Sequence, residues 1–139
     1  MKNDSKMEER IKDFLAIEKI AIFGMSRDTS KFGNRVYKNL TAKGYKLFPI
    51  HPLQGEIEGI RCFKSIAELP EKVGGAIMVI PPAKTEKALV DVAEAGIKRV
   101  WMQPGAESEA GIKYCEENGI SVIYEDCVMV RSASANPFG

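Results

Sequence analysis

Short apolar runs alternate with amphipathic segments along most of this chain, and this alternation restricts its fold more than any other feature. The apolar runs are nearly continuous, as expected for parallel strands that are buried on both faces. They predict strands at residues 19–24, 45–50, 76–80, 99–103 and 120–124. Apolar residues at helical spacing predict helices at residues 5–17, 33–43, 85–95 and 108–117.

Strands that alternate with helices form βαβ units, whose crossovers are right-handed. We therefore expect an α/β fold, a Rossmann-like doubly wound sheet of about five mainly parallel strands with helices on both faces. The 139 residues fit one domain. We expect an N-terminal helix packed on it within residues 1–17, the Rossmann-like domain over residues 18–130, and a tail at residues 131–139.

Three other segments carry weaker signals. Residues 51–59 are rich in proline and glycine and predict a loop, and residues 60–63 predict a short extended piece. Residues 65–69 predict a single helical turn. From Glu125 onward the chain has no clear pattern.

Composition excludes several classes of function. The net charge of +1 gives no global field for nucleic-acid binding. The three cysteines, Cys62, Cys115 and Cys127, are odd in number and too far apart to predict a disulfide framework or a zinc site. A highly charged beginning and the lack of an apolar run of ~18 residues predict no signal peptide and no membrane span. We expect a cytoplasmic protein that binds neither metal, nucleic acid nor membrane.

The carboxyl ends of the strands are the expected position of a ligand site. In an open α/β sheet, ligands bind outside these ends, where the strand order reverses. Four of the predicted strands end in segments that contain glycine or proline, which fix the backbone where it must approach a ligand closely. These segments are residues 24–26, 49–52, 80–82 and 103–105.

The turn after the first strand carries the strongest signal for a phosphate. It leads into a helix, whose amino terminus offers free N–H groups and a partial positive charge. Hydroxyl and cationic side chains surround it, namely Ser26, Arg27, Thr29, Ser30, Lys31 and Arg35. The alternative interpretation is that a turn rich in serine and threonine only caps the helix.

This turn is not a dinucleotide fingerprint. Ser26 and Thr29 stand where the second and third glycines of G-x-G-x-x-G would be. His51 and Pro52 stand where an NAD-binding fold places an acidic residue for the ribose. The chain also lacks the P-loop motif G-x-x-x-x-G-K-[ST]. These departures argue against NAD and against a P-loop nucleotidase.

Several of these segments, taken together, resemble the CoA-binding domain family. They are residues 20–26, residues 44–52, residues 96–103 and the pair Asp126-Cys127. The resemblance is to the small stand-alone members in particular, and it extends to the amino-terminal domain of the succinyl-CoA synthetase alpha subunit. It covers about residues 18–130 and implies a Rossmann-like fold that holds CoA at the first glycine turn.

The resemblance also implies a set of binding residues. The residues that would contact the pyrophosphate region are Gly24, Met25 and Ser26. Those that would meet phosphate charge, including the 3′-phosphate, are Arg27 and Lys31. The adenine or pantetheine side would be shaped by Ile80, Pro81 and Pro82. The pantetheine path would be bordered by Gln103, Pro104 and Gly105. The expected set is completed by Phe32, Pro49 and His51.

No catalytic constellation is present in the sequence. His51 is the only histidine, and Ser26 lacks the flanking G-x-S-x-G of a nucleophile elbow. A turn or ligand-contacting role for His51 is favoured over catalysis. A structural thiol is favoured at Cys127, with a disulfide to the CoA thiol as the alternative.

The sequence therefore predicts a non-catalytic protein that binds CoA or acyl-CoA. The alternative is a small NAD(P)- or other nucleotide-dependent redox or regulatory domain. The choice between a protein partner and a homo-oligomer stays open, as does the acyl group.

Overall fold

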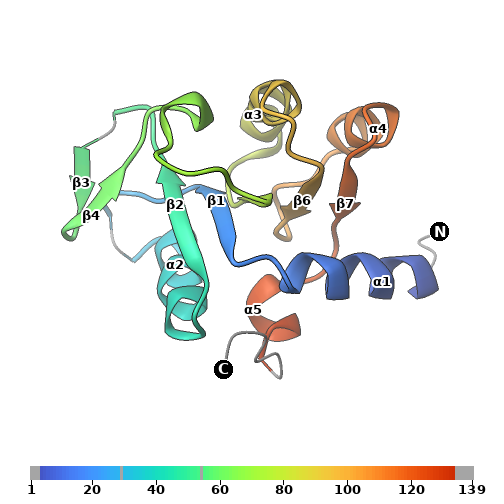
Figure 1. Ribbon diagram of the computed structural model, residues 1–139, viewed down its shortest axis with the longest axis horizontal. Helices are drawn as coiled ribbons and strands as arrows, with labels where there is room; N and C mark the ends of the chain where they lie inside the picture. The colour runs from blue at the N-terminus through green and yellow to red at the C-terminus, as the bar shows by residue number, and fades with distance from the viewer. Residues whose placement is uncertain (1–3, 29, 54, 134–139) are drawn as a thin grey trace.

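The computed structural model describes residues 4–28, 30–53 and 55–133 (Figure 1). At its centre is a five-stranded sheet in which every pair of neighbours is parallel. In spatial order its strands are β2 (Lys46–Ile50), β1 (Lys19–Phe23), β5 (Gly75–Met78), β6 (Arg99–Met102) and β7 (Ser121–Ile123). This parallel α/β sheet confirms the predicted Rossmann-like fold class.

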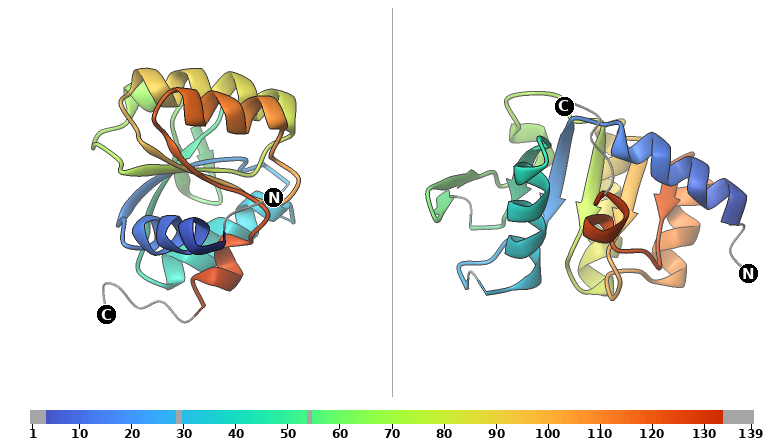
Figure 2. Two further views of the ribbon diagram at one scale, coloured as in Figure 1. Left: turned by 90° about the vertical axis from the view of Figure 1, so that its right-hand side faces the viewer. Right: turned by 90° about the horizontal axis from the view of Figure 1, so that it is seen from below.

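Helices cover both faces of the sheet, as Figure 2 (left) shows. One face carries α3 (Pro82–Glu94) and α4 (Glu109–Glu117). The other carries α1 (Asp4–Leu15), α2 (Phe32–Ala42) and the short α5 (Val128–Arg131). Each face has its own apolar core, so the strands are buried on both sides, which explains their continuous apolar sequences.

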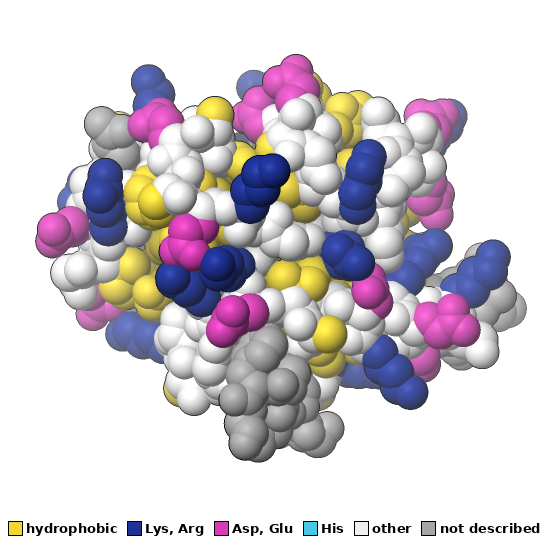
Figure 3. Space-filling model, in the orientation of Figure 1, with side chains coloured by type: hydrophobic (Ala, Val, Ile, Leu, Met, Phe, Trp, Pro, Cys, Tyr) yellow, Lys and Arg dark blue, Asp and Glu magenta, His cyan; other side chains and the backbone are white. Residues whose placement is uncertain are grey.

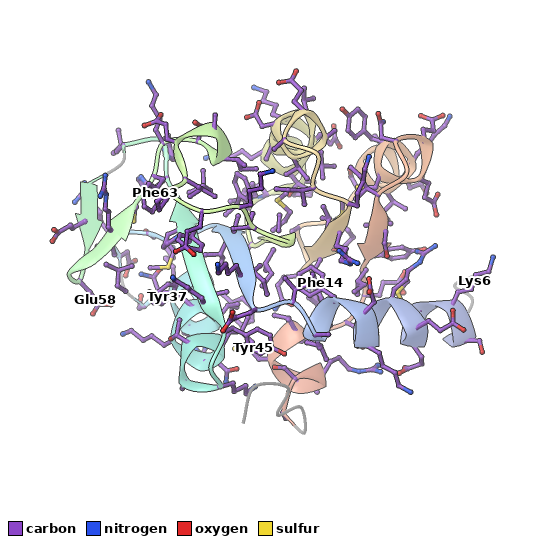
Figure 4. All side chains as sticks on the ribbon, in the orientation of Figure 1. Lys6, Phe14, Tyr37, Tyr45, Glu58 and Phe63 are labelled. Carbon is purple, nitrogen blue, oxygen red and sulfur yellow. The ribbon has the colours of Figure 1, made fainter. Side chains whose placement is uncertain are left out.

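Helix α1 is an integral part of the second layer. Its apolar face buries Met7, Ile11 and Phe14, and the Phe14 ring meets that of Trp101 edge-on at 5.4 Å between centroids. The hydroxyl of Tyr45 donates to the carbonyl of Leu15 at 2.6 Å; Phe14 and Tyr45 are labelled in Figure 4. Trp101 is fully buried, so it is a core residue.

A small hairpin extends the molecule beyond β2, where the sequence predicted a loop and a short extension. Its strands are β3 (Gly55–Ile57) and β4 (Ile60–Cys62), and a 3₁₀ turn, η1 (Ile66–Glu68), follows. Ile57 and Cys62 are buried against the core, and Phe63 adds an isolated bridge to Ile50. The loop prediction for residues 51–59 was wrong at its end, because strands of three residues are too short to show a period.

Two other predicted boundaries differ from the structure. Strand β5 ends at Met78, although the apolar sequence continues to Ile80, and α3 begins at Pro82 rather than at Thr85. Proline is well suited to the first position of a helix, because the amide it lacks would have no partner there. Helix α5 forms in the segment without a pattern, and the amide of Val128, its first residue, donates to the Oε1 of Gln103 at 2.7 Å.

The strand order places a switch point between β1 and β5. From β1 the chain moves to β2 on one side, and it then crosses back to β5, β6 and β7 on the other. The connections on either side of this point therefore leave the sheet on opposite faces. A crevice for a ligand is expected outside the carboxyl ends of β1 and β5.

Two glycines allow the close packing found at this switch point. Gly24 has a φ of +130°, and a Cβ there would lie 2.3 Å from the carbonyl oxygen of Val79. A Cβ on Gly33 would lie 2.1 Å from the carbonyl oxygen of Gly24. Real Cβ atoms do not approach backbone this closely. The first turn is thus held between the end of β5 and the start of α2, and glycine is required at both positions by the protein's own backbone.

Replacing Gly33 with alanine is expected to destabilise the fold by about 3 kcal/mol, because the added methyl group overlaps rigid backbone. Gly96→Ala is the control, since Gly96 has a φ of +78° and nothing within 4 Å of its Cβ position. Its expected cost is about 1 kcal/mol, from the left-handed conformation alone. Urea unfolding of both variants measures the difference. A smaller loss for Gly33→Ala than for Gly96→Ala would contradict the packing argument.

Candidate functional site

The parallel strands all point toward one edge of the sheet, and the predicted site residues follow their ends. In Figure 2 (right) the strands run downward, and the turn after β1 and the connections after β5 and β6 lie at the lower edge. The first turn spans residues 24–31. The segment after β5 spans residues 79–81, and that after β6 spans residues 103–108. Helices α2 and α3 both begin at this edge.

Asn34 holds the first turn in place. It lies in the first turns of α2 and is fully buried. Its Oδ1 accepts a hydrogen bond from the amide of Ser26 at 2.9 Å, and its Nδ2 donates to the carbonyl of Ser26 at 2.9 Å. This pair of bonds fixes the backbone of Ser26 relative to the helix. Sequence reasoning missed Asn34, although a polar residue on the buried face of a helix was a signal.

The loop after Ser26 is organised by its own hydrogen bonds. The hydroxyl of Ser26 accepts from the amide of Asp28 at 3.1 Å. The carboxylate of Asp28 accepts from the hydroxyl of Ser30 at 2.6 Å and from its amide at 3.2 Å. These bonds to Ser30 lower the pKa of Asp28. The Ser26 hydroxyl keeps its own proton for donation to a ligand, and Thr29 lies outside the described residues.

The amino terminus of α2 is open to an anion. Lys31 is its N-cap residue and makes no side-chain capping bond, and the first turn contains no acidic residue. Phe32 is 42% exposed beside it, with the guanidinium of Arg35 5.9 Å from its ring centroid. An uncapped helix start with cationic neighbours and a fixed preceding turn favours phosphate binding.

His51 follows β2 and belongs to the turn that joins the sheet to the hairpin. Its Nδ1 accepts from the amide of Leu53 at 3.1 Å, and its own amide donates to the carbonyl of Phe63 at 2.8 Å. Burial lowers the pKa of His51, and Arg27 lowers it further. The imidazole is therefore neutral at pH 7. Pro49 is tolerated within β2 because this is an edge strand of the sheet.

The ends of β5 and β6 present backbone and small apolar groups. Ile80 is half-buried, and its carbonyl accepts from the hydroxyl of the buried Thr85 at 3.3 Å. Pro81 is the N-cap residue of α3 and Pro82 its first residue, and both are exposed. Pro104 and Gly105 are exposed on the next connection. The residues after β5 and β6 therefore lie at the same edge of the sheet as the first turn.

Two predicted site residues point their side chains inward. Gln103 is 1% exposed, and its Nε2 lies 3.4 Å from the Sγ of Cys127 while its Oε1 accepts from Val128. Met25 is 4% exposed and packs in the apolar core. Only the backbones of Gln103 and Met25 face the strand ends, so any contact with a ligand is through peptide groups.

The first turn and the hairpin enclose a hollow of about 700 Å³. The guanidinium of Arg27 crosses to the hairpin, where its Nη1 donates to the carbonyl of Glu56 at 3.4 Å. The hollow is lined by Arg27, Leu53, Gly55, Glu56, Arg61, Cys62, Phe63 and Glu68. The sequence did not indicate Arg61 as a site residue, because only the folding of the hairpin places it in the same hollow as Arg27.

A larger hollow, of about 940 Å³, lies away from these strand ends, between η1 and the end of α3. One of its residues, Glu71, bridges Lys19 and Lys46 with distances of 2.7 and 2.6 Å. The hydrogen bonds from these two ammonium groups lower the pKa of Glu71 to about 2. Acidic and basic side chains lie close together on the face drawn in Figure 3. Because Lys19 and Lys46 already bind it, the carboxylate of Glu71 is not free to bind a ligand.

Residues 4–28, 30–53 and 55–133 contain no cluster of three or more histidine, cysteine or acidic residues that is able to hold a metal ion. Cys62 and Cys115 are buried, and burial raises the pKa of the Cys115 thiol to about 12. Cys127 is partly exposed. The helices in this part of the chain lack the length and apolarity needed to cross a bilayer.

The chain matches known proteins over most of its length. It is 30% identical to subunit alpha of the ADP-forming acetate–CoA ligase II of Pyrococcus furiosus, over 84% of this chain but only 28% of the ligase subunit. It is 29% identical to the uncharacterised protein YneT of Bacillus subtilis, over 96% of this chain and 98% of YneT. A solved structure of a conserved hypothetical protein from Pyrococcus furiosus has 39% identity and a TM-score of 0.76, covering 81% of this chain and 97% of that one.

The family model described as "CoA binding domain" matches residues 18–133. This range includes all five strands of the sheet, the first turn, the hairpin and α5. The chain therefore belongs to the CoA-binding domain family.

Proposed function

We propose that this protein binds CoA or an acyl-CoA at the carboxyl ends of its strands and performs no chemistry on it. The observation that carries the proposal is the turn at Ser26, which Asn34 fixes against the uncapped start of α2. A preorganised set of amide donors at a helix start suits a pyrophosphate. Membership of the CoA-binding domain family supports CoA as the molecule that carries it.

In this arrangement the pyrophosphate lies against the backbone of residues 24–26 and near the ammonium group of Lys31. The uncharged pantetheine arm crosses the exposed side chains of Pro81, Pro82 and Pro104. Phe32 offers an exposed aromatic face at the edge of the site. The charged and uncharged parts of the edge thus match the charged and uncharged halves of CoA.

A binding role without catalysis is supported by the state of the candidate groups. His51 is neutral, and the amide of Leu53 occupies its Nδ1. The thiols of Cys62 and Cys115 are buried. The chain spans only about a quarter of the length of the ligase subunit it matches, so the ligase reaction belongs to that larger protein.

We infer that the protein acts as a carrier, sensor or regulatory module that presents CoA to a protein partner or to a second copy of itself. Free cysteines at three positions favour a reducing compartment, so we place it in the cytoplasm.

CoA is expected to raise the midpoint of thermal unfolding by several degrees. A ligand at ~100 times its dissociation constant stabilises the fold by roughly 2.7 kcal/mol. Thermal unfolding with CoA, acetyl-CoA, NAD and NADP at matched concentrations provides the measurement. A shift with NAD or NADP alone would favour a nucleotide-dependent redox domain over the proposed function.

Asn34→Ala is expected to weaken CoA binding by at least about tenfold, because the amide of Ser26 loses its fixed position. It should also destabilise the fold by about 1–3 kcal/mol, since a buried amide and carbonyl lose their partners. Asn39→Ala on the same helix is the control, because the Oδ1 of Asn39 is buried without a hydrogen-bond partner. Calorimetric titration and urea unfolding measure both effects. Equal CoA affinity in the two variants would remove Asn34 from the site.

Acetyl-CoA is expected to remain intact when incubated with the protein. Release of free CoA, separated from the protein and measured by chromatography so that the protein's own cysteines do not contribute, should equal the rate in buffer. His51→Ala is the informative variant, because it removes the only imidazole. Thiol release by the unmodified protein that disappears in His51→Ala would show catalysis and overturn the non-catalytic role.

A further inference from the structure

The hollow between the first turn and the β3–β4 hairpin has no role in the arrangement described so far. It lies on the β2 side of the switch point, whereas the expected pantetheine path lies on the β5 and β6 side. The hairpin stands at one end of the molecule in Figure 1, and Phe63 is labelled beside it in Figure 4. A ligand that crosses the start of α2 therefore has space for a further group on this side.

Two guanidinium groups line this hollow from different parts of the chain. Arg27 comes from the first turn, and its Nη1 makes a long hydrogen bond of 3.4 Å to the carbonyl of Glu56. Arg61 comes from β4, and its guanidinium carbon lies 5.0 Å from the centroid of the Phe63 ring. Among the described residues, neither group has a carboxylate within ion-pair distance. Their donors are therefore available to an anion.

Two carboxylates also line the hollow, but neither forms an ion pair with Arg27 or Arg61. Glu56 stands opposite Arg61 in the hairpin register but forms no ion pair with it. Glu68 accepts from the hydroxyl of Ser65 at 3.5 Å. The charge of Arg27 acts on a wall of the hollow, since it opposes the rise that burial causes in the pKa of Cys62. Arg27 is the lining residue that the first turn contributes, so the charge on that side of the hollow is positive.

We infer that this hollow binds the 3′-phosphate of CoA through Arg27 and Arg61. The inference rests on the proposed function and concerns the same site. CoA carries two anionic groups on one ribose, a pyrophosphate on the 5′ oxygen and a phosphomonoester on the 3′ oxygen. With the pyrophosphate at the start of α2, Arg27 connects that position to the hollow. Arginine suits the second group because its fork of donors matches phosphate oxygens.

This assignment makes Arg27 and Arg61 specificity residues and fixes the direction of the ligand. The adenosine end lies toward the hairpin, and the thiol end lies toward Pro81 and Gly105. Dephospho-CoA and NAD lack the 3′-phosphate, so they leave both guanidinium groups without an anion. Lys31 is the N-cap residue of α2 and stays with the pyrophosphate.

The test compares the affinities of CoA and dephospho-CoA by calorimetric titration of the full chain. The unmodified protein should bind CoA at least about tenfold more tightly, as expected for hydrogen bonds between charged groups. Arg27→Ala and Arg61→Ala should each remove most of this preference while they retain affinity for dephospho-CoA. Glu56→Gln should increase the preference, because it removes a neighbouring negative charge.

Lys113→Ala is the matched control. It removes one positive charge from an exposed position on α4, at the other end of the sheet from the hairpin, and it should keep the full preference. Affinity for dephospho-CoA reports that each variant is folded. If Arg61→Ala loses both ligands, Arg61→Met keeps the aliphatic packing on Phe63 and takes its place.

The outcomes separate the two proposals. Preference for CoA that is lost in the arginine variants and kept in Lys113→Ala supports the assignment. Binding of CoA with no preference over dephospho-CoA, or a preference that survives both arginine substitutions, overturns the assignment and leaves the proposed function standing. Absence of binding by either ligand to the unmodified protein overturns both.

Discussion

The close approach of three backbone segments at the switch point is the constraint on which the rest of the site depends. The end of β5 lies against Gly24, and Gly24 lies against Gly33 at the start of α2. A single added methyl group at either glycine would separate these segments. Because they remain in contact, Asn34 reaches the backbone of Ser26 with both atoms of its amide. The anion-binding role proposed for the turn depends on this packing, since the helix start is held at a fixed distance from the turn.

The two sides of the switch point have different chemistry, and this difference gives the site its polarity. On the β5 and β6 side, the strand ends expose prolines and a glycine, and the polar side chain of Gln103 is used to bind α5. On the β2 side, the hairpin and the segment from Phe63 to η1 add an arginine, two carboxylates and an aromatic ring. The proposed ligand, CoA, has a charged end and an uncharged arm, and it matches this difference better than a dinucleotide with a nucleotide at each end.

Sequence reasoning found the elements of the sheet and the segments at their ends, because both leave local signals. Continuous apolar runs indicate buried parallel strands, and glycine and proline indicate where those strands end. The residues that were missed act through distant contacts. Asn34 looks like any polar helix residue until the burial of α2 is known, and Arg61 belongs to a strand of three residues. The sequence also did not predict that the side chain of Gln103 points inward. Its partner is α5, a helix of four residues, which is too short to show a helical period.

The sequence by itself determined the fold class, the edge of the sheet at which the site is proposed, and the resemblance to CoA-binding domains. These properties depend on hydrophobic periodicity and on residues that are adjacent in the chain, so a linear pattern is sufficient to reveal them. The tertiary structure alone decided which side chains face that edge. Met25 and Gln103 turn inward, Asn34 fixes the turn, and Arg27 meets the hairpin near Arg61. Those arrangements join segments up to about thirty residues apart, and only the packing of the two helical layers on the sheet brings them together.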